Sequence, residues 1–420
     1  MTAEVAPPER LTVPGLLEEA TTASGLTAWG DQGFVATLDR LLESCRETAG
    51  LTPAGWAVLR KVALRHLRNR LYLQAYLSTH GDVARTPIGP PVVITGLPRT
   101  GTTLLHNLLA LDPANRVLRF WEALHPVPTD PARAPGQSRP IGLPVGAATG
   151  GPHEREKLVA QASTWLERLY SLTPDFRSIH SLTAEGPEEC DALLQNSFAS
   201  QHFDDMFQAE SYSAWLNRAD LKEEYAYYAQ QLQTLTGPHE RELTWVLKSP
   251  GHLGYLDTVA AIFPGCLIVH CHRDPVEALA SYASLVMAVR SPHTDRTSPL
   301  DIGTHVVNRC AIAMARALQA RDSLGNDRFA DIGYPALVSD PLPAVRGLYA
   351  RLGRSLSGTA EAAMTRWLAE NPQHKHGRHR YTLSTFGLSS SQVAVSLGDY
   401  GERFAVEIGR GTNGQFRDGR

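Results

Sequence analysis

The sequence predicts an α/β fold in which helices flank a parallel β-sheet, with further helices at the N-terminus and in an insertion. Three observations lead to this prediction. Short apolar runs bounded by proline, glycine or charged residues have the length of buried strands. Helix-start signals, a hydroxyl or carboxylate residue followed by proline, come soon after several of these runs. Strands that alternate with helices indicate a parallel sheet covered on both faces.

Two helices are expected before the sheet. Apolar residues recur at helical spacing from Phe34 to Cys45, and a second helix begins at Thr52-Pro53 with a capping hydroxyl and a proline. The second helix carries a row of basic residues: Arg60, Lys61, Arg65, Arg68 and Arg70. Such a row is typical of a solvated helix face, and a surface for an anionic ligand is the alternative.

The strands and helices of the sheet follow in order. Residues 92–94 form the first predicted strand, and a glycine-containing loop then leads to a helix over 102–111 that ends before Pro113. Residues 153–235 carry helical patterns. Further strands are expected at 243–247, 267–270 and 329–332, with helices beginning at Ser249-Pro250, Asp274-Pro275 and Asp340-Pro341. Glu277, three residues after Asp274, suggests an acidic capping box.

Composition excludes several classes of protein. The 420 residues carry a formal net charge of −3, which argues against a strongly basic nucleic-acid binder. No apolar run approaches the roughly 18 residues of a membrane span. The five cysteines include no CxxC pair, so neither a disulfide scaffold nor a zinc ribbon is indicated. The N-terminus lacks a secretory signal pattern, and we therefore expect a cytoplasmic protein.

The segment GLPRTGTT, residues 96–103, is the most informative motif. It lies between a predicted strand and a predicted helix, where glycines and unpaired N–H groups can surround an anion. This arrangement predicts a phosphate-binding loop and hence a P-loop-type sheet. The nucleotide-triphosphatase pattern requires lysine where Thr102 stands, and the cation is instead Arg99. Hydrolysis of ATP or GTP is therefore not expected.

Three cations follow three predicted strands. Arg99, Lys248 and Arg273 each stand at or just after a strand end. The carboxyl ends of parallel strands meet at one edge of the sheet, where open α/β folds bind ligands. We therefore expect an electropositive cleft for a highly anionic small molecule.

Two motifs resemble those of sulfotransferases. The loop GLPRTGTT is similar to their 5′-phosphosulfate loop, in the arginine-containing form of many bacterial members. The segment RDPVEALAS, from Arg273 to Ser281, is similar to their 3′-phosphate motif. The resemblance covers roughly residues 90–350. Short segments that also resemble sulfotransferase sequences are Phe120-Trp121-Glu122, Leu247-Lys248-Ser249-Pro250 and His379-Arg380-Tyr381.

The resemblance implies a donor, 3′-phosphoadenosine-5′-phosphosulfate (PAPS), and transfer of its sulfuryl group to a hydroxyl or amine of a small-molecule or lipid-like acceptor. Arg273 and Ser281 would bind the 3′-phosphate, and Arg380 belongs to a basic segment that closes over the nucleotide. No metal is required, because arginine and lysine neutralise the charge. The 5′-phosphosulfate would be bound by Pro98, Arg99, Thr100, Gly101, Thr102 and Thr103.

Catalytic roles are expected for Arg99, Lys248 and Glu122. The first two would neutralise charge as the leaving phosphate departs. Glu122 follows a run, 117–121, that can be a second strand, which would bring its carboxylate beside the donor cleft as the base. A structural Glu122 paired with Arg119 or another cation is the alternative, and His125 and His202 are the reserve candidates for the base.

Four regions are predicted along the chain: an N-terminal helical region (1–88), a core (89–125 and 240–355), a helical insertion or lid over the acceptor site (126–239), and a C-terminal region that closes the nucleotide site (356–420). Aromatic residues of the insertion either line an apolar acceptor pocket or pack in the core. They are Phe198, Phe203, Phe207, Tyr212, Trp215, Tyr225, Tyr227 and Tyr228.

Two other functions fit parts of the sequence. An ATP-dependent small-molecule kinase would need lysine in place of Thr102 and a magnesium-binding carboxylate, for which Asp274 is the one candidate. A nucleotide-binding protein without catalysis would lack a base. His270 and His272 share one strand face and are expected in the core. A metal site at His374, His376 and His379 is an alternative with no partner at a recognised spacing.

Overall fold

The computed structural model describes residues 11–83, 87–127, 152–173, 181–372 and 382–409. Within them lies a five-stranded sheet with strand order β2-β3-β1-β4-β5, in which every neighbouring pair is parallel. The predicted α/β class is therefore confirmed. The strands are β1 (Val92–Gly96), β2 (Asn115–Arg116), β3 (Thr244–Lys248), β4 (Leu267–His272) and β5 (Phe329–Gly333).

Alternate residues of β1 are buried in two different apolar clusters, one on each face of the sheet. Val92 and Ile94 pack with α4 (Thr102–Leu109), α16 (Pro341–Arg351) and α17 (Gly358–Glu370). Val93 faces the larger cluster, which includes α12 (Leu256–Ile262), α13 (Pro275–Arg290) and α14 (Pro299–Leu324). Both faces of the sheet are thus covered, which explains why β1 and β4 each begin with three consecutive apolar residues.

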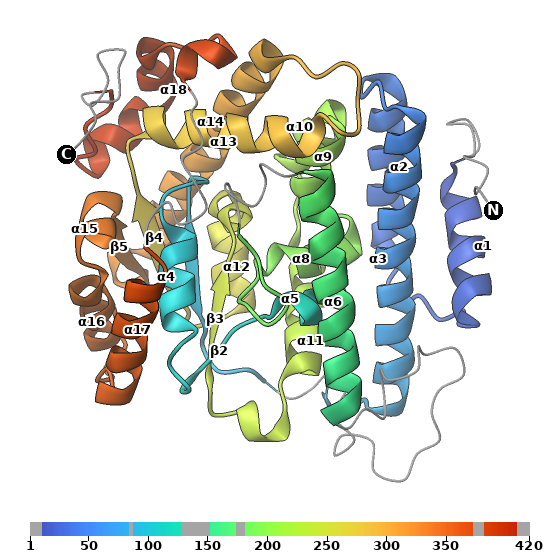
Figure 1. The fold of residues 1–420 in the computed structure, drawn as a ribbon, viewed down its shortest axis with the longest axis horizontal. Coiled ribbons are helices and arrows are strands. Elements are labelled where there is room, and N and C mark those ends of the chain that lie inside the picture. The colour runs from blue at the N-terminus through green and yellow to red at the C-terminus, as the bar shows by residue number, and fades with distance from the viewer. Residues whose placement is uncertain (1–10, 84–86, 128–151, 174–180, 373–381, 410–420) are drawn as a thin grey trace.

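The N-terminal helices are α1 (Val13–Ser24), α2 (Gly33–Glu47) and α3 (Pro53–Thr79). As predicted, α3 begins at Pro53, and the hydroxyl of Thr52 accepts a hydrogen bond from the N–H of Gly55 at 2.9 Å. Figure 1 shows α1–α3 at one side of the molecule and β5 with α15 (Tyr334–Ser339), α16 and α17 at the other.

Helices also fill the region between β2 and β3. They are α5 (Phe120–Leu124), α6 (Pro152–Leu172), α8 (Asp191–Leu194), α9 (His202–Phe207), α10 (Glu210–Leu216) and α11 (Lys222–Leu235). Near the C-terminus, α18 (Ser390–Arg403) packs beside α13 and α14 (Figure 1). None of the helices in the described ranges combines the length and apolar character needed to cross a membrane.

Two of the predicted helix starts after strands are confirmed with their caps. Ser249 accepts from the N–H of Gly251 at 2.9 Å and opens a 3₁₀ turn, Pro250–Tyr255, that leads into α12. Asp274 accepts from the N–H of Val276 at 2.9 Å and caps α13. The expected capping box at Glu277 is wrong, because this carboxylate accepts hydrogen bonds from the Arg273 guanidinium instead.

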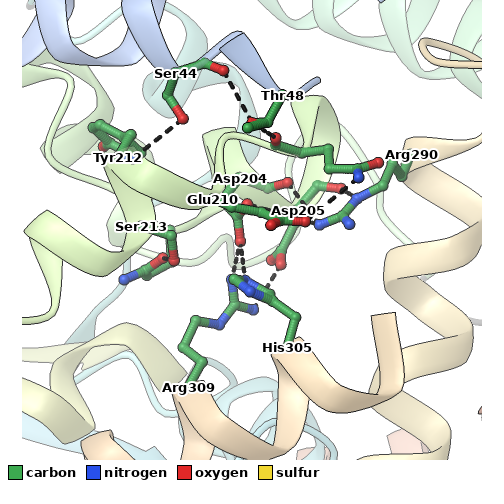
Figure 2. Close-up of polar contacts among 12 residues, drawn as sticks. Ser44, Thr48, Asp204, Asp205, Glu210, Tyr212, Ser213, Arg290, His305 and Arg309 are labelled. Atoms are coloured by element: carbon green, nitrogen blue, oxygen red, sulfur yellow. Dashed lines mark hydrogen bonds and ion pairs between the residues drawn. The ribbon is translucent and has the colours of Figure 1, made fainter. Parts of the chain in front are cut away.

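A buried ionic cluster joins the insertion to the helices behind the sheet (Figure 2). Asp204 on α9 lies 2.5 Å from Nε2 of His305 and 3.0 Å from Nη1 of Arg309, both on α14. Burial opposes charge at Asp204, yet these cations hold the pKa of its carboxyl well below the ordinary range. The pKa of His305 is raised in turn, because Asp204 outweighs its burial.

The pH dependence of stability follows from these two shifts. Asp204 contributes stability above its unfolded pKa of about 3.9, and the contribution is lost as the pH falls below that value. His305 contributes fully below about pH 6.5, and its contribution is lost as the pH rises through the raised folded pKa. The pair therefore stabilises most between about pH 4 and 6.5.

We predict that His305→Gln lowers the free energy of unfolding by roughly 1–3 kcal/mol at pH 5.5, because a charge-assisted hydrogen bond is lost. At pH 9 the difference from the wild type should shrink, since the charged form of His305 is lost as the pH rises through its raised folded pKa. Urea denaturation at the two pH values measures this. An equal difference at both would contradict the charged role of His305.

Candidate functional site

Backbone geometry at two glycines shapes the loop after β1. A Cβ at Gly96 would lie 2.4 Å from the carbonyl oxygen of Cys271 on β4, closer than real Cβ atoms come. Gly101 has φ 91°, in the left-handed region that favours glycine. Arg99 also has a positive φ, 70°, which is uncommon for a residue with a side chain. The loop therefore turns tightly against the end of β4.

The threonines of the loop serve different purposes. Thr100 is buried and donates its hydroxyl hydrogen to the carbonyl of Leu97 at 2.7 Å, which closes the turn. Thr102 and Thr103 form the first turn of α4, where backbone N–H groups have no helical partner. Both side chains face the large cavity described below. These features suit the binding of an anion.

The two sequence motifs meet at the edge of the sheet. Nε of Arg99 donates to the hydroxyl of Ser281 on α13 at 3.1 Å. Nη1 of Arg273 donates to the carbonyl of Arg99 at 2.8 Å, and its guanidinium lies over the ring of Tyr334 at 4.0 Å. The structure therefore brings together Arg99, Arg273 and Ser281, although about 180 residues separate the loop from the second motif.

Lys248 lies at the end of β3 beside the same loop. Its buried ammonium donates to the hydroxyl of Thr103 at 3.4 Å and pairs with Glu189 at 2.6 Å. Glu189 thus balances the charge of Lys248. The three cations predicted for one sheet edge do lie there, at the ends of the neighbouring strands β1, β3 and β4.

Glu122 is located differently from the prediction. The expected strand over 117–121 does not form, because β2 ends at Arg116 and α5 begins at Phe120. The buried carboxylate accepts from Arg116 at 2.5 and 2.9 Å and from the N–H of Arg119 at 2.9 Å. It is not among the residues that line the cavity. The geometry favours the alternative, a structural Glu122 paired with a cation.

Glu188 is a carboxylate that the sequence reasoning missed. It is half-buried and lines the cavity, and its Oε1 accepts from the N–H of Glu189 at 2.8 Å. Oε2 has no hydrogen-bond partner among the described residues. Burial, and secondly the charge of Glu189, raises the pKa of Glu188 to about 7. A buried carboxyl with a free oxygen and this pKa can exchange a proton with a ligand at neutral pH.

The histidines divide into two groups. His125 and His202 line the cavity, and burial with the nearby charge of Arg65 lowers the pKa of His125 to about 4. His270 and His272 are buried on one face of β4, as expected, next to Phe404. Their nitrogens and an oxygen of Asp331 lie within 4.8 Å of one another, so this trio could hold a metal ion. Both oxygens of Asp331 already accept from Arg321.

A cavity of about 1460 Å³ extends from Arg99 and Arg273 to the side of α3. Its walls are mainly apolar. The apolar lining comes from several helices: Val58 and Val62 of α3, Leu124 of α5, Leu169 of α6, Leu285 and Val286 of α13, and Ile312 of α14. A volume of this size exceeds that of a typical drug-sized pocket, about 300–1,000 Å³. It can accommodate a nucleotide together with an apolar second ligand.

Trp165 of α6 is an aromatic residue of the insertion that lines this cavity, but those named in the sequence analysis do not. All eight named in the sequence analysis are absent from its walls, and six of them are almost fully buried in the apolar core. The core-packing alternative therefore holds. Arg380 and the histidines His374, His376 and His379 lie outside the described residues.

Comparisons with known proteins agree on one family. Residues 90–358 match the sequence pattern of the sulfotransferase family. The chain is 23% identical over 334 residues to the omega-hydroxy-beta-dihydromenaquinone-9 sulfotransferase Stf3 of Mycobacterium bovis, covering 76% of this chain and 77% of the relative. The same figures hold for Stf3 of Mycobacterium tuberculosis.

Solved structures show the same fold. The crystal structure of sulfotransferase STF1 from Mycobacterium tuberculosis H37Rv matches with a TM-score of 0.80 and 29% identity, covering 94% of this chain and all of that one. Sulfotransferase STF9 from Mycobacterium avium matches with a TM-score of 0.78 and 24% identity, covering 96% and 99%. The N-terminal helices are thus part of the shared architecture.

Proposed function

Since this chain belongs to the sulfotransferase family, we propose that it transfers the sulfuryl group of PAPS to a hydroxyl, or an amine, of a lipid-like small molecule. The observation that carries the proposal is the meeting of Arg99, Arg273 and Ser281 at one sheet edge. The kinase alternative is set aside, because Thr102 occupies the position of the required lysine and the family match is to sulfotransferases.

Donor binding is assigned to the two motifs. Backbone N–H groups at the start of α4, the hydroxyls of Thr102 and Thr103 and the guanidinium of Arg99 would hold the 5′-phosphosulfate. Arg273 and Ser281 would hold the 3′-phosphate. Glu277 forms an ion pair with Arg273, with Oε2 at 2.9 Å from Nη2. Glu277 keeps this arginine in place until a phosphate competes for it.

Charge neutralisation during transfer is assigned to Arg99 and Lys248. Negative charge grows on the 5′-phosphate as the sulfuryl group leaves it, and preorganised cations stabilise that charge. Lys248 lies beside Thr103 and is held there by Glu189. Because the lysine is buried, its interaction with the phosphate is screened less than at a surface.

We assign the acceptor's base to Glu188 in place of Glu122. A hydroxyl must lose a proton as the sulfuryl group arrives, and a base with a pKa near the working pH does this best. Glu188 lines the cavity and has a free oxygen among the described residues, whereas both oxygens of Glu122 are bound by Arg116. His125 and His202 stay as reserve candidates.

The acceptor class is assigned from the cavity. Its mainly apolar walls and large volume suit a lipid-like molecule better than a polar sugar chain. The name of one relative, Stf3, specifies a hydroxylated menaquinone as that protein's acceptor, which is in line with a lipid-like ligand here.

The first test is nucleotide binding. Calorimetry should show that 3′-phosphoadenosine 5′-phosphate binds more tightly than adenosine 5′-phosphate, because only the former reaches both motifs. Arg273→Ala should weaken its binding by roughly 1.5–3 kcal/mol, the range for hydrogen bonds to charged groups, and remove the preference. Arg346→Ala, which breaks an exposed pair with Glu361, is the control and should change neither. Equal affinities in the wild type would overturn the role of the second motif.

The second test is the base. Glu188→Gln should leave nucleotide affinity unchanged and lower kcat by about 10²–10⁴-fold. The acidic limb of the wild-type pH–rate profile, expected near pH 7 where the Glu188 carboxyl protonates, should disappear. Glu122→Gln is the matched control: it should lower stability but keep turnover per folded molecule. Near-normal kcat in Glu188→Gln would move the base to another residue.

A further inference from the structure

Arg65 faces the cavity from α3. The cavity-lining residues Val58, Lys61, Val62, Arg65 and Arg68 recur at three- and four-residue spacing, so they form one face of the helix. Arg60 points elsewhere, since it is exposed and pairs with Glu19 of α1. The basic row on α3 is therefore divided between a solvated surface and the wall of the cavity.

Arg65 is half-buried, and its surroundings do not balance its charge. Its Nη2 lies 3.1 Å from Nε2 of His66, whose Nδ1 lies 2.9 Å from Oδ1 of Asn196. Burial keeps His66 neutral by lowering its pKa well below 6.5. No carboxylate of the described residues forms an ion pair with Arg65, and burial lowers the pKa of its guanidinium to about 10.

Most buried arginines among the described residues have carboxylate partners; Arg70 of α3 is an exception, since it donates to the backbone carbonyls of Trp29 and Asp31. Arg116 pairs with Glu122 and Glu240. Arg309 pairs with Asp204 and Asp205. This is the normal arrangement, because a charge removed from water is costly unless a counter-charge compensates it. Arg65 does not follow this pattern. It lies at the wall of a cavity that a ligand can enter.

The position of Arg65 separates it from the nucleotide site. Arg99 and Arg273 approach the cavity from the ends of β1 and β4, next to Tyr334 of α15. Figure 1 shows α15 and α3 at opposite sides of the molecule. Apolar side chains of α5, α6 and α13 also line the cavity that these two ends share. A ligand that reaches from one end to the other would have a reactive end, an apolar body and a far end beside Arg65.

We propose that Arg65 anchors an acceptor subsite for an anionic headgroup, a carboxylate or a phosphate, at the end of the cavity away from the nucleotide. The guanidinium can donate two parallel hydrogen bonds to either group. The acceptor is then an acidic amphiphile with a hydroxyl at its other end. This inference rests on the proposed function for the identity of the reacting end, but the binding of the headgroup does not depend on transfer.

The test uses three probes with one chain length and different heads: decanoate, decyl phosphate and 1-decanol. Their affinities are measured by calorimetry on the full chain in saturating 3′-phosphoadenosine 5′-phosphate, so that Arg99 and Arg273 are occupied. At least one acid should bind about tenfold more tightly than the alcohol, as expected for a charge-assisted contact. Which acid binds better identifies the headgroup.

Arg65→Met should reduce this preference to about one, whereas Arg60→Met, on the exposed face of the same helix, should retain it. Equal affinities of acids and alcohol in the wild type, or an undiminished preference in Arg65→Met, would overturn the proposal. Nucleotide affinity is recorded separately without the probes, so failure of the proposed function is distinguished from failure of the subsite.

Thermal unfolding gives an independent readout. If Arg65 is reserved for a ligand, removing its uncompensated charge should leave the Tm of the ligand-free chain unchanged or raise it. A clear fall in Tm for Arg65→Met, with no fall for Arg60→Met, would show a structural arginine and contradict the proposal.

Discussion

The close approach of Gly96 to the carbonyl of Cys271 is the constraint on which the site depends. Any side chain at position 96 would push the loop away from the end of β4. The contact brings the carbonyl of Arg99 within hydrogen-bond distance of Arg273, and the Arg99 side chain within reach of Ser281. Two motifs distant in sequence thus become one anion site because two adjacent parallel strands end side by side.

Charge compensation explains how such a site exists without its ligand. Lys248 is neutralised by Glu189, and Arg273 by Glu277. Each carboxylate lies close in sequence or space to the proposed chemistry, and Glu189 also raises the pKa of Glu188. The same carboxylate thereby links the lysine at the leaving group to the proposed base. Arg65 lacks such compensation, and for this reason it is assigned to a ligand and not to the scaffold.

Local signals in the sequence were sufficient for the strands β1, β3, β4 and β5, the capped starts of α3 and α13, and the three cations at one edge. They were insufficient where contacts between distant parts of the chain determine the position and environment of a side chain. Glu122 follows an apolar run that looks like a strand, but Arg116 and the N–H of Arg119 bind its carboxylate at the start of a short helix. Glu188 belongs to no recognisable motif, and its importance comes from its place at the cavity, its burial and the neighbouring charge of Glu189.

The basic row on α3 illustrates the same limit. Composition could not separate Arg60, which is exposed and paired, from Arg65, which lines the cavity. Helical spacing groups Arg65 with Val58 and Val62, but the neighbouring wall that encloses them is formed by helices distant in sequence. Sequence patterns report local geometry, whereas the cavity is a property of the assembled fold.

The central claim is that the loop 96–103 and the segment from Arg273 to Ser281 bind opposite ends of one nucleotide. A crystal structure of the chain with 3′-phosphoadenosine 5′-phosphate tests it most directly. The account predicts that the 5′-phosphate accepts hydrogen bonds from the start of α4 and that the 3′-phosphate contacts both Arg273 and Ser281. A nucleotide whose 3′-phosphate lies in solvent, or away from these two residues, would contradict the account.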